Sequence, residues 1–233
     1  LLIPCYLVIQ QPDLGTSILI AGTGIIIIWL AGLNIKYFVY SGLLLIVSLP
    51  FAVSLLKPYQ KSRILTFFNP DRDPLGAGYQ IIQSKIAIGS GGFFGKGFLK
   101  GTQSYLEFLP EKHTDFIFTL FSEEFGFLGS IMLLLLYILL IYRIISIGFY
   151  AKSFFSKLFC FGFASAIFLY IFVNISMVLG LLPIVGAPLP IMSYGGSSML
   201  SIMLGLSIVM SCKIYSQDPV SYTHLRAHET VSH

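Results

Sequence analysis

Apolar runs long enough to cross a lipid bilayer recur along this 233-residue chain and restrict the folds open to it. About 20 residues at 1.5 Å rise span the hydrocarbon core, where a helix satisfies its own backbone hydrogen bonds. Only 10% of the residues are charged, well below the level of soluble domains. We therefore predict an all-α, polytopic transmembrane helix bundle. The expected spans lie at about 1–9, 14–33, 36–56, 116–142, 157–181 and 190–213.

The two ends of the chain differ from this pattern. It opens inside an apolar stretch, LLIPCYLVI, so we expect it to begin partway through a helix. After about Ser216 the apolar pattern stops, and we expect 216–233 to be a non-native tail behind a partial membrane domain, 1–215. His224 and His228 in the tail have helical i, i+4 spacing, but no third ligand accompanies them, so we predict no metal site there.

A polar section at about 57–114 separates the third and fourth predicted spans, and connections of this length are usually functional. Basic residues mark the opposite ends of the spans, and by the positive-inside rule those ends are cytoplasmic. These residues are Lys36, Arg143, Lys152, Lys157 and Lys213. The polar section should then lie outside the membrane as a large extracytoplasmic loop, together with Gln10–Thr16 and Leu181–Ser198.

The glycine-rich stretch GSGGFFGKG, at 89–97, fails the nucleotide-binding P-loop template at both ends. Its glycines, flanked by Lys85, Lys96 and Lys100, still suit a diphosphate at a membrane surface. Lysines that reach toward lipid head groups are an equally good interpretation. No basic run with interleaved aromatic residues is present, which argues against nucleic acid as a partner. Just before this stretch, YQIIQSKIAI at 79–88 predicts a short interfacial helix with Tyr79, Ile82 and Ile86 on one face.

Charged residues crowd into FLPEKHTDFIF, at 108–118, where the fourth predicted span begins. Thr114 could cap that helix, and Asp115 in its first turn would be favoured by the helix dipole. An ordinary capped helix is one interpretation, but Glu107, Glu111, Lys112 and His113 add more charge than capping requires. Farther along, Glu123 and Glu124 lie inside the span. Ionisable groups there are usually functional, or else are paired within the bundle.

Four motifs occur in an order and spacing that resemble the SEDS family of bacterial peptidoglycan polymerases. The motifs are QPDLGTS, the long run NPDRDPLGAGYQIIQSKIAIGSGGFFGKGFLKGTQSYLEFLPEKHTDFIF, EEFGFLG, and LLPIVGAPLPIMSYGGSS. The resemblance covers about residues 1–215 and is stronger to the RodA branch, which acts in cell elongation and shape, than to the FtsW branch. It implies a ten-helix fold, of which this chain would hold about the last five to six helices.

The resemblance also implies a function and a site. Members polymerise lipid II, the undecaprenyl-diphosphate-linked precursor, on the outer face of the bacterial cytoplasmic membrane, with a class B penicillin-binding protein as partner. The essential acid of the family's HTDF motif corresponds to Asp115, which we expect to act as general base. The expected substrate-binding residues are Lys85, Lys96, Lys100, Glu107, Glu111, Lys112, His113 and Ser193. No cofactor is certain, although the two glutamates could position a sugar, a lysine or a divalent cation.

Two other classes of function remain open on the sequence. A lipid II flippase would place ionisable groups near the middle of the membrane. Glu123 fits that description, because a regular helix would carry it about 12 Å deeper than Asp115. A non-catalytic scaffold for cell-wall assembly would need none of these residues. The helix dipole favours the ionised form of Asp115 and partial burial opposes it, so the sequence does not fix its strength as a base.

Overall fold

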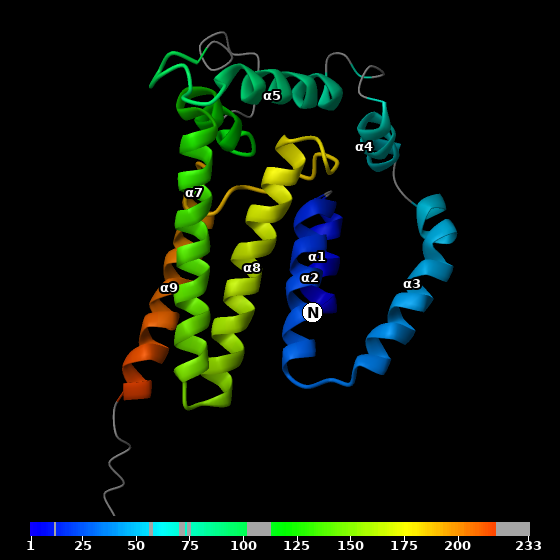
Figure 1. Ribbon diagram of the computed structural model, residues 1–233. Coiled ribbons are helices and arrows are strands. Elements are labelled where there is room, and N and C mark those ends of the chain that lie inside the picture. Colours follow the sequence, from blue (N-terminus) through cyan, green and yellow to red (C-terminus); the bar gives the residue numbers. More distant parts are fainter. Residues whose placement is uncertain (12, 56–57, 70–72, 74–75, 102–112, 218–233) are drawn as a thin grey trace, which may run out of the picture.

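The computed structural model describes residues 1–11, 13–55, 58–69, 73, 76–101 and 113–217. Every regular element in these ranges is an α-helix (Figure 1). The helices are α1 (Leu2–Gln10), α2 (Leu14–Leu30), α3 (Ile35–Leu55), α4 (Pro58–Phe68), α5 (Ala77–Gly91), α7 (Ile117–Tyr150), α8 (Phe154–Val178) and α9 (Gly196–Gln217). Within the described ranges α7, α8 and α9 are long and apolar enough to cross a membrane. The predicted all-α membrane bundle is confirmed.

Helix α8 is the centre of the bundle. It contacts α2, α7 and α9, while α1 packs on α2 and α5 lies across one end of α7 (Figure 1). The buried core between α7, α8 and α9 is largely aliphatic, with Ile144, Ile167, Met177 and Val209 among its members. Helix α3 stands apart from the bundle in Figure 1 and joins it through α4. The site described below lies at the end of the bundle that α5 covers.

Two helix boundaries differ from the sequence prediction. Helix α7 continues to Tyr150 instead of ending near 142, and α9 begins at Gly196 instead of near 190. Helix α9 starts late because Gly186 and Ile191 have positive φ values, 73° and 68°, which do not fit a right-handed helix. The stretch between α8 and α9 is therefore mostly irregular, and it is this stretch that contributes to the site.

The predicted helix is present as α5, and the face that packs on the bundle is a different one from the apolar face of Tyr79, Ile82 and Ile86. Ile81, Ser84 and Ala87 are buried, whereas Ile86 is 49% exposed. The Ser84 hydroxyl donates its one proton to the Val178 carbonyl at 2.7 Å, and the Ile81 carbonyl lies 3.0 Å from the same oxygen. A serine whose hydrogen bonds are satisfied can be buried at little cost, so Ser84 can lie on the face of α5 that packs on α7 and α8.

Helix α7 is broken at Gly126, where φ is 68° and ψ is −162°. The glycine-rich loop after α5 packs into this break and exchanges backbone hydrogen bonds with it. The bonds run from Lys96 N to Glu123 O, Gly97 N to Glu124 O, Phe127 N to Gly92 O and Leu128 N to Phe93 O, at 2.9–3.1 Å. A side chain on Gly126 would collide with the loop backbone. The glycines thus allow two backbones to meet and replace the helical bonds lost at the break.

Candidate functional site

Three polar segments that are distant in sequence meet at one end of the bundle. Gly15, at the start of α2, packs so closely on Val185 that it has no room for a Cβ. Arg63 of α4 donates from its guanidinium to the Ile184 carbonyl at 3.2 Å. The 181–195 segment therefore contacts both the α1–α2 connection and the long polar section. The three segments lie together at one end of the bundle, and their extracytoplasmic side stays a prediction.

Asp115 belongs to a turn at residues 113–116 that immediately precedes α7. The prediction that Thr114 caps this helix is wrong: the residue at the cap position is Phe116, and no side chain caps the helix. Asp115 accordingly precedes the first helical turn instead of lying within it. Asp115 still directly precedes the residue at the cap position, so its backbone lies at the end of the helix where the free N–H groups gather.

Three consecutive carbonyl groups of this turn are held by the C-terminal third of the chain. Tyr194 N donates to His113 O at 2.9 Å, and Ser193 Oγ donates to Thr114 O at 2.6 Å. Asn174 Nδ2, from α8, donates to Asp115 O at 2.8 Å. Side chains and backbone more than 50 residues away thus fix the peptide planes on both sides of Asp115 without using its carboxylate.

The half-buried Asp115 side chain faces the irregular segment between α8 and α9. A Cβ placed on Gly186 would lie 3.5 Å from Asp115 Oδ2, an ordinary van der Waals contact, so the carboxylate lies close to this backbone, and the φ of 73° there favours glycine. Ser193 also accepts from Leu189 N at 2.7 Å, which ties the segment to itself near the same turn. The Asp115 carboxylate therefore lies against backbone whose position is set by hydrogen bonds.

An open hollow borders this turn on the α9 side. Its volume is about 660 Å³, and His113, Ile117, Ser193 and Tyr194 contribute to its lining. His113 is exposed, whereas Ser193 is only 7% exposed and its hydroxyl is engaged by Thr114 and Leu189. The structure thus brings His113, Asp115 and Ser193 of the predicted set together at one site.

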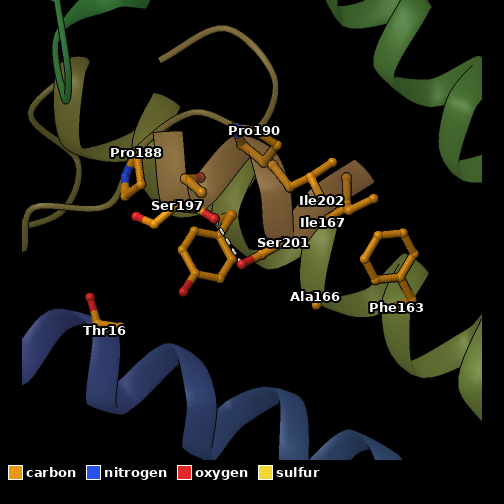
Figure 2. Close-up of a pocket in the computed structure, with 11 residues that line it drawn as sticks. Thr16, Phe163, Ala166, Ile167, Pro188, Pro190, Ser197, Ser201 and Ile202 are labelled. Atoms are coloured by element: carbon orange, nitrogen blue, oxygen red, sulfur yellow. Dashed lines mark hydrogen bonds between the residues drawn. The ribbon is translucent and has the colours of Figure 1, made fainter. Parts of the chain in front are cut away.

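A second cavity of about 450 Å³ lies between α2, α8 and α9 (Figure 2). Hydroxyl groups from Thr16, Ser197 and Ser201 line the part near the irregular segment, and Phe163 and Ile202 line the apolar part. Pro188 and Pro190 form its edge and belong to the same segment that borders Asp115. A cavity that is polar at one side and apolar at the other suits an amphiphilic molecule.

The three predicted lysines have different surroundings. Lys85 is exposed on α5, and its side chain lies against Gly180, directly after the C-terminus of α8. Lys100 is exposed at the end of the glycine-rich loop. Lys96 forms a 2.7 Å ion pair with Glu123, which is fully buried in α7. Of the two interpretations of Glu123, pairing within the bundle is the one that the structure bears out.

Part of the predicted site lies outside the described residues. Glu107, Glu111 and Lys112 fall there, so their roles and a divalent cation beside them stay predictions. Within the described residues no group of three or more His, Cys, Asp or Glu side chains could hold a metal ion.

Two residues that contribute to the site were missed from the sequence. Asn174 matched only a glycosylation pattern inside an apolar span, and Arg63 was one basic residue in a polar section. A buried amide in an apolar helix is itself a signal, because polar groups within membrane spans are costly and usually bonded to a specific partner. Nothing in the sequence identified the carbonyls that Asn174 and Arg63 bind.

Comparison with known proteins agrees with this arrangement. The family model described as "Cell cycle protein", for FtsW, RodA and SpoVE, matches residues 1–218. Peptidoglycan glycosyltransferase MrdB of Escherichia coli is 51% identical over 209 residues, covering 89% of this chain and 56% of the relative. Stage V sporulation protein E of Bacillus subtilis is 40% identical over 213 residues, covering 91% and 57%. This chain thus spans little more than half the length of these curated relatives.

Two solved structures share the fold. A structure described as "Structural coordination of polymerization and crosslinking by a peptidoglycan synthase complex" matches with a TM-score of 0.73 and 35% identity, covering 91% of this chain and 59% of the other. A mutant of the rod shape determining protein RodA of Thermus thermophilus matches with a TM-score of 0.59 and 25% identity, covering 92% and 54%. With the match of the family model to nearly the whole chain, these likenesses show that it belongs to the cell cycle protein family of FtsW, RodA and SpoVE.

Proposed function

We propose that this chain is part of a peptidoglycan glycosyltransferase that polymerises lipid II into glycan strands during cell elongation. The observation that carries the proposal is the fixed turn at 113–116, which holds the Asp115 carboxylate beside the 181–195 segment, and residues of that segment contribute to the lining of both cavities. A relative 51% identical in sequence bears the name of such an enzyme. The cavity of about 450 Å³ between α2, α8 and α9 is polar at one side and apolar at the other. This distribution suits a lipid-linked sugar, whose chain is apolar and whose head is polar.

The proposed reaction needs one base. Asp115 takes the proton from the acceptor sugar hydroxyl as that oxygen forms a bond to the anomeric carbon of the donor, and the bond from that carbon to the lipid diphosphate breaks. A single displacement inverts the anomeric centre and requires no second carboxylate as nucleophile. Exposed Lys85 and Lys100 are proposed to stabilise the negative charge of the departing diphosphate. His113 and Ser193 are proposed to line the path of a sugar.

A purified full-length protein that contains this chain is the direct test. With lipid II as the only substrate, we expect long glycan strands that are separated by electrophoresis and digested by a muramidase. A scaffold or a flippase would leave lipid II unpolymerised, and a flippase would instead move a fluorescent lipid II across vesicle membranes. The Glu123–Lys96 pair favours the polymerase, since the buried carboxylate that the flippase hypothesis relies on is already bonded to a lysine.

The proposed site faces the extracytoplasmic side of the bacterial cytoplasmic membrane. Tyr194, beside Asp115, and Tyr150, at the far end of α7, provide a matched test because both are 80% exposed. In intact cells we expect a membrane-impermeant maleimide to label Tyr194→Cys and to leave Tyr150→Cys unlabelled until the membrane is opened. Labelling of Tyr150→Cys alone in intact cells would reverse the orientation and contradict the proposed site.

A class B penicillin-binding protein is the proposed partner. One of the solved structures that shares the fold is described as a complex for polymerization and crosslinking. Crosslinking consumes the strands that polymerisation makes, so a physical link between the two activities is chemically reasonable. Co-purification of the two full-length proteins tests this partnership.

A further inference from the structure

Asn174 makes an unusual set of contacts for a residue in the last turns of an apolar helix. It lies in α8 and has no exposed surface. Its Nδ2 atom is 2.8 Å from the carbonyl oxygen of Asp115 and 2.6 Å from that of Ala187. One amide group therefore joins three separate parts of the chain: α8, the turn before α7, and the irregular segment between α8 and α9.

The orientation of this amide is fixed by its partners. Both neighbours of Nδ2 are carbonyl oxygens, which only accept, so the nitrogen and not Oδ1 must face them. Among the described residues Oδ1 has no hydrogen-bond partner. A buried amide oxygen without a partner is costly. The two bonds to carbonyl oxygens therefore explain why an asparagine occupies this place, although its own Oδ1 atom has no partner among the described residues.

The two carbonyls belong to the turn that carries the Asp115 carboxylate and to the segment that this carboxylate faces. One belongs to Asp115 itself, and the other belongs to Ala187, which follows Gly186. Gly186 is the residue whose added Cβ would lie 3.5 Å from Asp115 Oδ2. Because a single nitrogen binds both carbonyls, it sets the separation between the carboxylate's own backbone and the backbone that the carboxylate faces.

We infer that Asn174 is a positioning residue that holds the Asp115 carboxylate at its working distance from the Gly186–Ala187 backbone. This inference rests on the proposed function, in which Asp115 is the base. Proton transfer depends on the base lying within hydrogen-bond reach of the acceptor hydroxyl, and displacement by about 1 Å can cost on the order of 100-fold in rate. Loss of the Asn174 amide should therefore slow the chemical step without weakening substrate binding.

The test uses Asn174→Ala and Asn174→Leu in a full-length protein that contains this chain. Leucine keeps roughly the size of the side chain but has no N–H to donate. For both variants we expect kcat to fall by roughly 10- to 100-fold, with KM for lipid II unchanged. Ser165→Ala is the matched control, since the Ser165 hydroxyl donates to Phe161 O within the same helix, and it should leave both constants unchanged.

A second readout does not depend on polymerisation. Carbodiimide labelling of Asp115, followed by mass spectrometry, reports the environment of the carboxylate, and its rate should change in both Asn174 variants and not in Ser165→Ala. If the wild-type protein makes no polymer, the proposed function fails, and labelling alone decides the role of Asn174. Folded variants with wild-type kcat and labelling rate would overturn the inference. Failure of both variants to accumulate in the membrane would also overturn it, because Asn174 would then serve folding alone.

Discussion

Asp115→Asn is expected to abolish polymerisation of lipid II while the protein still inserts and folds. Asparagine has nearly the shape of aspartate, but it cannot take a proton from the acceptor hydroxyl. A positioned general base contributes about 10²- to 10⁴-fold in rate, so the remaining activity should fall near the detection limit of a gel assay. The fold should persist because three of the bonds that hold this turn end on the backbone carbonyls of His113, Thr114 and Asp115, which the substitution leaves in place.

Asp13→Asn is the matched control for this prediction. Asp13 is a carboxylate at the same end of the bundle, where its Oδ1 accepts from Thr16 N at 3.0 Å and caps α2. Asparagine caps helices about as well as aspartate, so stability and polymer yield should both stay near wild type. Unchanged polymer length and yield in Asp115→Asn would remove Asp115 from the catalytic assignment. Equal losses in both variants would indicate a general effect of charge at this end of the bundle.

The sequence predicted the helices of the membrane bundle far better than the connections between them. Hydropathy is a local property, so apolar runs such as 154–178 can be recognised as membrane helices without knowledge of the fold. The break at Gly126 has no such signal, because glycine is common in membrane helices and the apolar pattern continues across it. What makes the break tolerable is the loop at 91–97, which supplies hydrogen bonds from more than 25 residues away.

The glycine-rich loop illustrates how a motif can be correctly noticed and still be assigned a different use. Its pattern indicated close backbone approach, and close approach is what it provides. The backbone that it approaches, however, is that of α7, and the N–H groups of Lys96 and Gly97 donate to carbonyls of Glu123 and Glu124. Composition identifies which backbone can come close, whereas its partner is a property of the tertiary fold.

The candidate site was predicted in part for the same reason. Asp115 and His113 came from a local cluster of charge, and Ser193 came from a motif, so each could be named from the sequence. Asn174 could not, because its role depends on carbonyls at Asp115 and Ala187 that come close only in the folded chain. Carbonyl groups are present at every residue, and no sequence pattern distinguishes those that will accept a side-chain bond.

Lys96→Met is expected to destabilise the protein strongly. It would leave the Glu123 carboxylate, which has no exposed surface, without the ammonium group 2.7 Å away. Removing one partner of a buried ion pair typically costs about 3–5 kcal/mol, because the remaining charge stays in a medium of low dielectric constant. We expect a lower midpoint of thermal unfolding in detergent and less protein in the membrane. Lys100→Met, on the exposed end of the same loop, should leave stability unchanged.

Adding Glu123→Gln to Lys96→Met should restore much of the lost stability, because it removes the buried charge that the first substitution exposes to apolar surroundings. This double variant also separates two roles of Lys96. If the lysine serves only to hold the loop on the broken helix, the restored protein should polymerise lipid II at close to the wild-type rate. A stable but inactive double variant would instead support the prediction that Lys96 contacts the substrate. Additive losses in stability would contradict the energetic coupling of Lys96 and Glu123 itself.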